Sequence, residues 1–372
     1  MYIYYRMSVL KFVFVACALF SNSIMAVVGA PTLRGTSSAA AAAAATGTSA
    51  VVEEVYNVDY IHEWSMFNNF LDRFEKKYET LEDFVSRFGV FRSNLRHIIV
   101  HNMDHTQNFT MAVNAFTDLT AEEFKAKYVG GMLKRGSDVK KSSCKTFTST
   151  SAPSSETLDW VTKGGVTPVK NQGQCGSCWS FSATGAMEGA WFTHSGNLVS
   201  LSEEQLVECS KKYGNMGCNG GMMDNAFQYA IDQGMCSEEA YPYTSGTGTT
   251  GSCQKCTPVV TMSSCANVAA DNQVVLKAAV ALGPVSIAIE ADTAVFQSYS
   301  SGVITSSKCG TTLDHGVLIA GYGVEDGIKY WLVKNSWGAD WGVNGYVKIE
   351  RSDSTSDKGI CGIAMEASFP IV

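Results

Sequence analysis

The chain has 372 residues, of which 45% are hydrophobic and 17% charged, and its formal net charge is −7. This length and composition allow one or two buried cores, and two domains are expected. Residues 158–372 hold 12 basic and 20 acidic side chains, with Arg351 as their one arginine. A region so acidic and poor in arginine is not expected to bind nucleic acid.

The first 30 residues have the pattern of a signal peptide. Arg6 and Lys11 precede the apolar run from Phe12 to Phe20, and a site with small residues, Val28-Gly29-Ala30, follows. About nine apolar residues are too few to span a membrane. We therefore expect the chain to enter the secretory pathway, where disulfides are permitted.

Residues 31–54 differ in composition from the rest of the chain. They are mostly Ala, Ser, Thr and Gly and include seven consecutive alanines, Ala39 to Ala45. Such a composition cannot bury a core, so we expect a tether.

Residues 55–150 are expected to form helices that end in a linker. Two sets of residues recur at steps of three and four: Trp64, Phe67, Phe70, Leu71 and Phe74, then Asp83, Arg87, Phe91, Asn94, Ile98 and Asn102. On spacing alone, both indicate ordinary amphipathic helices. The basic stretch with Gly and Ser between Lys134 and Lys145 indicates an exposed linker. Asn108-Phe109-Thr110 is a glycosylation sequon, with Asn108 as the acceptor.

The run NQGQCGSCWSFS, from Asn171 to Ser182, places a cysteine at the start of a predicted helix. After Cys178, the apolar residues fall three or four apart: Trp179, Ala183, Ala186, Met187, Ala190 and Trp191. The amide groups and dipole of a helix N-terminus lower the pKa of a thiol and favour the nucleophilic thiolate. Cys178 is therefore the candidate nucleophile.

Cys175 and Cys178 also form a Cys-x-x-Cys pair, which by itself is found in redox sites and in zinc sites. The other pair with this spacing, Cys253 and Cys256, begins 75 residues after Cys178. A zinc ribbon expects about 15–20 residues between its pairs. We therefore predict no metal and no cofactor.

A cysteine nucleophile needs a base, and residues 158–372 offer two histidines, His194 and His315. If the helix from Cys178 continues to His194, about 1.5 Å per residue puts that imidazole roughly 24 Å from the thiol. His315 lies in the apolar run LDHGVLIAGYG, where a histidine is more often merely buried. As the remaining imidazole, it is nevertheless the predicted base, with the proton mostly on its ring in the resting pair.

Asn335, in KYWLVKNSWGADWG, is the candidate for orienting the imidazole. A third polar group in a catalytic triad fixes the tautomer and the ring plane of the base. Asn335 ends a strand-like apolar run, and Trp337 would shield the contact from water. Without that role, an asparagine at such a place is usually a turn former.

The remaining elements change from helical to strand-like. Ser202 to Gln205 has the form of a capping box and opens a short helix to Cys209, and Met223 to Gln233 is another helix. The predicted strands are Val285 to Glu290, Val317 to Ala320, Lys329 to Lys334 and Tyr346 to Glu350. A helical lobe and a strand-rich lobe are expected, with the candidate site in the cleft between them.

The run CGSCW with NQG before it resembles the active-site sequence of papain and cathepsin L, and NSWG resembles the context of the family's orienting asparagine. The resemblance implies an α+β fold with a helical N-terminal lobe and a β-barrel-like C-terminal lobe. It also implies a cysteine endopeptidase, in which Gln172 and the backbone N–H of Cys178 form an oxyanion hole. Without this resemblance, Gln172 would be taken for a surface amide.

Residues 55–150 resemble the inhibitory prosegment of cathepsin L-like zymogens. Asp83 stands where the family usually has Glu, and Ala112 where a Gly is usual before Asn114-Ala115-Phe116-Thr117-Asp118. The catalytic domain would then span residues 151–372, with the mature start between Thr148 and Thr157. Low pH is the expected trigger, because protonated carboxylates weaken the prosegment's ion pairs.

The resemblance also implies how substrate is bound. Gly220 and Gly221 would pair with an extended peptide, with the backbone carbonyl of Asp314 on the other side. The pocket for the second residue before the cut would favour Leu, Val or Phe, and Glu366 at its far end would also accept Arg. The remaining substrate-binding residues implied are Met222, Met223, Ala288, Leu313, Gly316 and Trp337.

Disulfide pairing is taken from the same resemblance: Cys175 with Cys218, Cys209 with Cys253, and Cys309 with Cys361. Cys17 leaves with the signal peptide, Cys178 stays free, and Cys144 lies in the linker. Cys236, Cys256 and Cys265 exceed the usual three bridges. Two of them are expected to form a fourth, which leaves one odd thiol.

The expected partners are protein and peptide substrates, the chain's own prosegment and cystatin-type inhibitors, for a monomer that binds neither nucleic acid nor membrane. The expected destination is a lysosome, a vacuole or the extracellular space.

Two other classes of protein stay open. A redox or metal protein would need both Cys-x-x-Cys pairs reduced, and a catalytically silent storage or binding homologue typically lacks Cys178 or His315, both present here.

Overall fold

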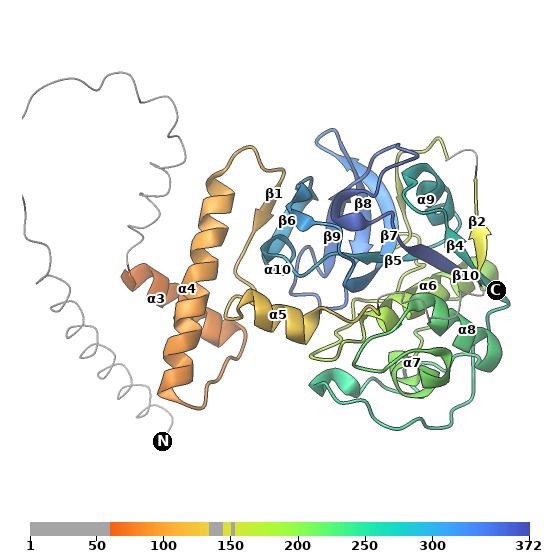
Figure 1. The fold of residues 1–372 in the computed structure, drawn as a ribbon, viewed down its shortest axis with the longest axis horizontal. Helices are drawn as coiled ribbons and strands as arrows, with labels where there is room; N and C mark the ends of the chain where they lie inside the picture. The colour runs from red at the N-terminus through yellow and green to blue at the C-terminus, as the bar shows by residue number, and fades with distance from the viewer. Residues whose placement is uncertain (1–59, 134–143, 150–152) are drawn as a thin grey trace, which may run out of the picture. The chain divides into compact units, whose positions relative to one another are not determined.

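The computed structural model describes residues 60–133, 144–149 and 153–372 (Figure 1). The expected signal peptide, the tether and most of the expected linker lie outside these residues. None of the helices within the described ranges combines the length and apolarity that a membrane span requires.

The expected prosegment contains α3 (Tyr60–Arg73), α4 (Leu81–Met103), β1 (Phe109–Met111) and α5 (Ala121–Tyr128). In Figure 1, α3 crosses the long α4. The apolar stripes predicted for the two helices meet in a cluster of its own, in which the buried residues are Phe67, Phe70, Phe88, Phe91 and Leu95. Aromatic rings in contact account for most of this small core, so the prosegment has a hydrophobic centre separate from the catalytic domain.

The polar residues on the predicted face of α4 bind the chain that follows it. Asn94 Nδ2 donates to the carbonyl oxygens of Thr117 and Leu119, both at 2.9 Å. About two turns further along α4, Asn102 Nδ2 donates to Met111 O at 2.8 Å. These side chains satisfy backbone groups of a segment with little secondary structure of its own, and thereby fix its path.

The helical lobe consists of α6 (Cys178–Ser195), α7 (Glu203–Cys209) and α8 (Met223–Gln233). These bounds agree with the predicted helices, and α6 does continue through His194. Ser202 caps α7 by accepting a hydrogen bond from the backbone N–H of Gln205 at 3.0 Å. The lobe encloses an apolar cluster centred on the buried face of α6.

The second lobe is built on one ten-stranded sheet, in the order β1-β6-β9-β8-β7-β5-β10-β4-β2, with β3 paired to β7. Its remaining elements are β2 (Lys145–Phe147), β3 (Leu158–Asp159), β4 (Ser264–Val268), α9 (Gln273–Val280), β5 (Val285–Ile289), α10 (Ala294–Ser298), β6 (Tyr299–Ile304), β7 (His315–Glu325), β8 (Ile328–Lys334), β9 (Tyr346–Glu350) and β10 (Ala367–Ile371). The four predicted strands correspond to β5, β7, β8 and β9. The expected α+β class and the division into a helical and a strand-rich lobe are confirmed.

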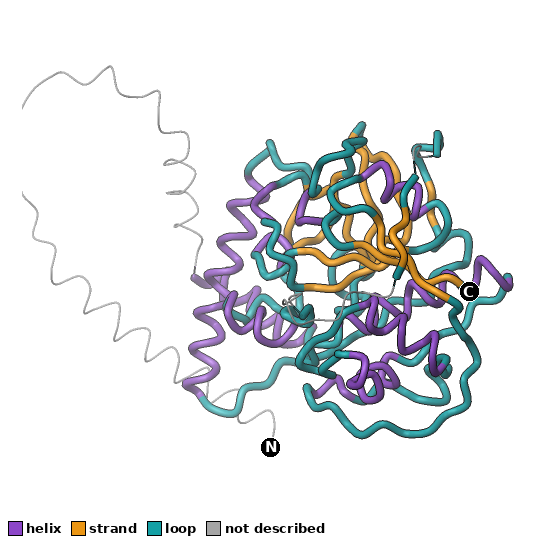
Figure 2. The backbone as a smooth tube through the Cα atoms, turned by 45° about the vertical axis from the view of Figure 1, so that its right-hand side comes forward, coloured by secondary structure: helices purple, strands orange, loops and turns teal. Residues whose placement is uncertain are grey.

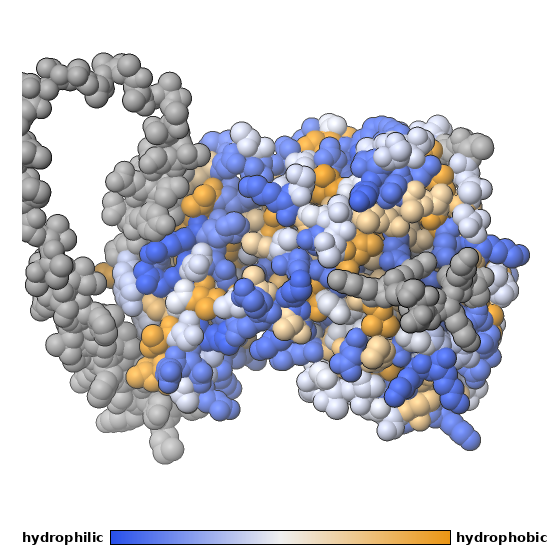
Figure 3. All heavy atoms as spheres, viewed as in Figure 1, coloured by the Kyte–Doolittle hydropathy of each residue, from blue (hydrophilic) through white to orange (hydrophobic). Residues whose placement is uncertain are grey.

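Figures 1 and 2 both show α6, α7 and α8 gathered below the strands. Helix α6 joins the two lobes, because Ser182 Oγ donates to Val317 O of β7 at 2.7 Å and Ser286 Oγ of β5 donates to Ser182 O at 2.7 Å. The face shown in Figure 3 mixes hydrophilic and apolar residues and has no continuous apolar band. The site expected between the lobes therefore forms where α6 meets β7.

Candidate active site

Cys178 is the first residue of α6 and is fully buried. It is the one free cysteine of the described residues. The Cys175–Cys218 disulfide ties the loop before α6 to the loop that carries Gly220, and Gly176 N donates to Cys218 O at 3.0 Å. Two covalently joined loops therefore fix the position of the thiol.

His315 and Asn335 come from adjacent strands, at the start of β7 and just beyond the end of β8. His315 Nε2 and Asn335 Oδ1 are 2.8 Å apart. Asn335 Oδ1 also accepts the backbone N–H of Ser336 at 2.8 Å, which identifies it as the acceptor. His315 must then donate its Nε2–H, so Nδ1 carries the free lone pair and can accept a proton.

Folding brings the histidine to the thiol. The backbone N–H of Gly316, directly after His315, donates to Cys178 Sγ at 3.2 Å across 138 residues of sequence. His315 is buried, and its Nδ1 has no hydrogen-bond partner among the described residues. The indole of Trp337 lies 4.7 Å from the imidazole of His315, measured between ring centroids.

Gln172 lies beside the thiol loop and is buried. Its Nε2 donates to Cys175 O at 2.9 Å and to Tyr128 O of the prosegment at 3.4 Å. Its Oε1 accepts from Ser336 Oγ at 2.7 Å. The amide thus points its N–H groups toward the loop before Cys178, and the hydroxyl of Ser336 fixes that orientation.

Two residues that hold Gln172 were not predicted. Ser336 stands inside the NSWG run, so its place beside Asn335 was a usable signal. The hydroxyl of Tyr243 donates to Gln172 O at 2.8 Å and lies 2.8 Å from Ser177 Oγ. No sequence pattern connects Tyr243 with a glutamine 71 residues away.

The prosegment crosses the site between Gly130 and Leu133. Gly130 N donates to Asp314 O at 2.9 Å, Gly221 N donates to Gly131 O at 2.9 Å, and Leu133 N donates to Gly221 O at 3.2 Å. Asp314 O and the backbone of Gly221 are among the groups expected to bind substrate, whereas Gly220 N donates to Gly217 O at 3.3 Å and does not contact the described part of the prosegment by a backbone hydrogen bond. The prosegment therefore blocks the positions that a substrate backbone would use.

Gly131 passes directly over the Cys178 thiol. A Cβ atom added at this position would lie 2.5 Å from Cys178 Sγ and 2.8 Å from Gly176 O. Only a glycine permits such a close approach without displacing the thiol or the backbone.

Burial under the prosegment determines the protonation of the pair. It raises the pKa of the Cys178 thiol to about 12, although the N–H of Gly316 favours the thiolate. Burial also lowers the pKa of His315 to about 4, against the smaller opposite effect of Asn335. The expected charge-separated resting pair is therefore not the state of this covered form, in which thiol and imidazole are both neutral near pH 7.

A cavity of about 500 Å³ opens between the lobes next to the prosegment residues Met132 and Leu133. Of the predicted pocket residues, Met222, Met223, Leu313 and Glu366 line it. Ala288 and Gly316 are not among the lining residues. Ala288 is fully buried in β5, and a Cβ on Gly316 would meet Met132 Sδ at 3.3 Å. Asp224, Asn267, Thr311, Thr312 and Met365 line the cavity without having been predicted.

The structure joins all three cysteine pairs implied by the resemblance, Cys175–Cys218, Cys209–Cys253 and Cys309–Cys361. Cys236 bonds to Cys256. The expectation of one odd thiol is wrong, because Cys265 bonds to Cys144 of the linker. Neither Cys-x-x-Cys pair is a reduced pair, and no group of metal-ligating side chains gathers within the described ranges.

The sequon residue Asn108 is exposed. Its Nδ2, the atom that carries an N-linked glycan, donates to Thr305 Oγ1 of the catalytic domain at 3.1 Å. The sequon therefore lies where the prosegment meets β6.

A buried thiol at a helix N-terminus, an imidazole held by an amide, and a prosegment over both define the zymogen of a cysteine protease. Residues 154–371 match the family model described as papain family cysteine protease, and residues 67–124 match that of the cathepsin propeptide inhibitor domain. The chain belongs to the papain family and is the zymogen of a cysteine endopeptidase, with its own prosegment as inhibitor.

Relatives of the chain carry the names of thiol or cysteine proteases. The chain is 46% identical over 291 residues to the thiol protease SEN102 of Hemerocallis, covering 77% of this chain and 80% of that one. It is 43% identical over 299 residues to germination-specific cysteine protease 1 of Arabidopsis thaliana, covering 78% of each. Among solved structures, it resembles the proform of the ragweed pollen allergen Amb a 11, with a TM-score of 0.76 and 37% identity over 86% of this chain and 96% of that one. The recombinant stem bromelain precursor gives a TM-score of 0.75 and 34% identity, over 84% and 99% of the two chains.

Proposed function

We propose that Cys178 is the nucleophile, His315 its base, Asn335 the residue that orients the imidazole, and Gln172 an oxyanion donor. Once the prosegment leaves, water reaches the pair and the thiol can pass its proton to His315 Nδ1. The thiolate then attacks the peptide carbonyl, and the oxyanion receives hydrogen bonds from Gln172 Nε2 and Cys178 N–H. His315 returns the proton to the leaving amine, and water hydrolyses the thioester.

The contact that supports this assignment best is the hydrogen bond from Gly316 N to Cys178 Sγ, since it brings residues from both lobes together. An epoxysuccinyl inhibitor should label the processed enzyme, and peptide mapping should find the label on Cys178. Cys178→Ser should abolish both labelling and peptide cleavage. Label on another residue, or cleavage that persists in Cys178→Ser, would reject the assignment.

For specificity, we infer that the cavity beside Met222 and Leu313 accepts an apolar side chain at the second position before the cut. Glu366 also lines this cavity, and a carboxylate there would accept Arg as well. Cleavage of Phe-Arg, Leu-Arg and Arg-Arg reporter peptides should be compared before and after Glu366→Ala. The Arg-Arg rate should fall selectively, and an unchanged rate would refute a role for Glu366.

For maturation, we propose a signal peptide over residues 1–30, a tether over 31–54, a prosegment with linker over 55–150 and a catalytic domain over 151–372. Activation at acidic pH is part of this proposal. The purified zymogen should mature faster at pH 4.5 than at pH 7.5, and equal rates would exclude an acid trigger.

The five disulfides support folding in an oxidising compartment. We propose a lysosomal, vacuolar or extracellular destination, a monomeric enzyme, glycosylation at Asn108 and inhibition by cystatin-type proteins. Glycosidase treatment of the purified zymogen should lower its mass, and Asn108→Gln should remove that difference. An identical mass for both proteins would show that the sequon is unused.

A further inference from the structure

The linker ends in a strand that belongs to the sheet of the catalytic domain. β2 (Lys145–Phe147) pairs in parallel with β4, with Lys145 opposite Ala266 and Phe147 opposite Val268. The Cys144–Cys265 disulfide begins this strand. Neither family model includes it, because the propeptide match ends at residue 124 and the protease match starts at 154.

Contacts beyond the disulfide also hold β2. The ring of Phe147 packs on the edge of Phe369 in β10, at 5.3 Å between centroids. The backbone N–H of Ala269 donates to Phe147 O at 3.3 Å. Cys265 itself is buried within β4, so the covalent bond anchors the strand to the core and not to a surface loop.

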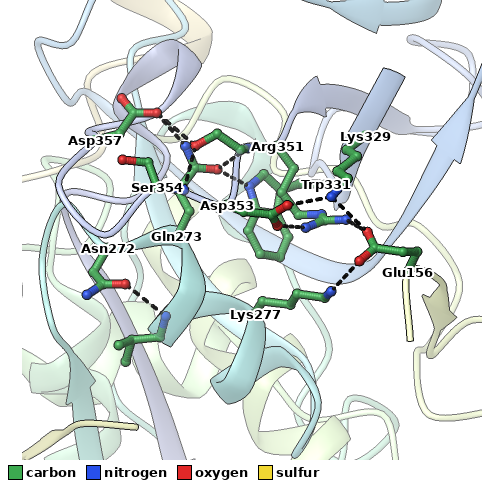
Figure 4. Close-up of polar contacts among 12 residues, drawn as sticks. Glu156, Asn272, Gln273, Lys277, Lys329, Trp331, Arg351, Asp353, Ser354 and Asp357 are labelled. Carbon is green, nitrogen blue, oxygen red and sulfur yellow. Dashed lines mark hydrogen bonds and ion pairs between the residues drawn. The ribbon is translucent and has the colours of Figure 1, made fainter. Parts of the chain in front are cut away.

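A second anchor follows a few residues later at Glu156. Figure 4 shows its carboxylate facing Arg351, Lys277 and Lys329, which come from three different parts of the catalytic domain. The distances are 2.7 Å to Arg351 Nη2, 3.2 Å to Lys277 Nζ and 3.3 Å to Lys329 Nζ. The expected maturation region thus lies between a disulfide on one side and an ion-pair cluster on the other.

We propose that the Cys144–Cys265 bond keeps residues 144–147 on the catalytic domain when the zymogen is processed, so that the edge of β4 is a permanent binding surface for the chain's own linker. This rests on the proposed maturation by prosegment removal. A cut between Phe147 and Glu156 leaves the prosegment attached through one disulfide and the new N-terminus held by Glu156. A cut before Cys144 leaves β2 as the first strand of the mature chain. The crosslinked Cys144 peptide is retained in both cases.

Attachment through the disulfide has a kinetic consequence. A prosegment cut after Phe147 but still tethered rebinds as an intramolecular inhibitor, at an effective concentration on the order of millimolar. Its release requires either a second cut before Cys144 or reduction of this disulfide, for example by a dithiol. In that exchange the reductant's two thiols become a disulfide, and Cys144 and Cys265 become thiols.

The test uses zymogen matured at pH 4.5 without reductant, then blocked with iodoacetamide and digested without reduction. Mass spectrometry should find the Cys144 peptide linked to the Cys265 peptide in nearly all molecules. Mature enzyme that lacks Cys144, with Cys265 alkylated or capped, would overturn the proposal. In a separate aliquot, treated with a dithiol and then with an epoxysuccinyl inhibitor before any alkylation, labelling of Cys178 shows whether the enzyme is an active thiol protease.

A paired variant tests whether the disulfide is the anchor. Cys144→Ser/Cys265→Ser should lose residues 144–147 after any cut beyond Phe147, and Cys236→Ser/Cys256→Ser is the matched control that retains them. Should the first variant fold poorly, brief treatment of the mature wild-type enzyme with a dithiol provides the same comparison.

Release of residues 144–147 by the dithiol is expected if the cut lies after Phe147. If the cut lies before Cys144, the segment stays on the chain and dithiol treatment should lower the melting temperature by several degrees. The proposal is overturned if the dithiol neither releases the segment nor lowers the melting temperature.

Discussion

At the residue scale, two opposing effects act on the thiol. The start of a helix favours a thiolate by about 0.3–1 kcal/mol at exposed sites, whereas removal of water from a buried charge costs several times more. Burial therefore decides the outcome in the zymogen and raises the pKa of Cys178 to about 12. The prosegment suppresses the nucleophile chemically as well as sterically.

This leads to a spectroscopic prediction. The zymogen should show no thiolate absorbance near 240 nm between pH 5 and 8, because a thiol with a pKa of about 12 stays protonated there. The processed enzyme should show it, since the thiol is then exposed to water and His315. The difference spectrum against Cys178→Ser isolates the signal, and equal absorbance in zymogen and processed enzyme would contradict the role given to burial.

A second residue-scale prediction separates the oxyanion hole from the nucleophile. Gln172→Ala should lower kcat by roughly 10²-fold, the usual cost of one oxyanion donor. Alkylation by iodoacetamide forms no oxyanion, so its rate should stay within about twofold. Gln174→Ala, at the neighbouring exposed position, is the control. Parallel losses in both assays would mean that Gln172 holds the thiol loop and does not stabilise an oxyanion.

At the element scale, the residues of the site were more predictable than the strands and strand pairings around them. Periodicity located β5, β7, β8 and β9, whose apolar runs are long enough to show a pattern. β1 and β2 have three residues each, and their pairing depends on strands far away in the sequence. The bond of Cys265 was missed for a related reason, since Cys144 was assigned to a linker that processing was expected to remove.

Glu156 carries a prediction at this scale, because it joins the chain before β3 to α9, β8 and the end of β9. The hydrogen bond from Arg351, together with those from the neighbouring lysines, lowers the pKa of the Glu156 carboxyl to about 2. The lowered value means that its stabilisation is complete above about pH 4.5 and is lost as the pH falls through about 2. The cluster should therefore survive the acidity proposed for activation.

The measurement is the melting temperature of Glu156→Gln across pH. Because Glu156 is 44% exposed, its contribution should be about 1 kcal/mol, which lowers Tm by roughly 2–4 °C. The deficit should be nearly the same at pH 7 and pH 4.5 and shrink toward pH 2. Glu239→Gln, at an exposed position, should show no deficit. A difference that vanishes by pH 4.5 would show that Glu156 is not the charged anchor.

At the scale of the whole molecule, the prosegment is held mainly by backbone pairing and aromatic packing. Phe116 and Phe124 place their edges on Trp337 at 5.7 and 5.2 Å between centroids. Its one ion pair to the catalytic domain within the described residues joins Lys125 to Asp292. The Arg87–Glu123 pair lies inside the prosegment and keeps its charge at pH 4.5, because the guanidinium lowers the pKa of Glu123 to about 2. Among the described residues, protonation of carboxylates at pH 4.5 therefore breaks few of the prosegment's ion pairs.

His315 is a group of the site whose protonation favours opening. Closure over the site lowers its pKa from 6.5 to about 4, so the open form binds a proton more readily than the closed form. The closed form should then lose stability as the pH falls from about 6.5 to about 4, by up to roughly 3 kcal/mol. Asp314 acts in the opposite direction and by a comparable amount, since burial raises its pKa from 3.8 to about 7 and its protonation favours closure. The residue proposed as the catalytic base would then also contribute to the pH dependence of inhibitor release.

Inactive zymogens can test this without self-processing. A fixed amount of mature enzyme is added to Cys178→Ser zymogen, and prosegment cleavage is divided by the rate on an unstructured reporter peptide at each pH. Between pH 7 and 4.5, His315 should increase this ratio by up to about 10²-fold relative to the same protein without the imidazole. The change in the ratio between the two pH values should be smaller by about that factor in Cys178→Ser/His315→Gln than in the parent, because a neutral amide replaces the titrating ring. Cys178→Ser/Lys125→Ala should follow the parent. If the cleavage ratio changes equally with pH in the His315→Gln protein, the carboxylates and not His315 make the closed form sensitive to acid.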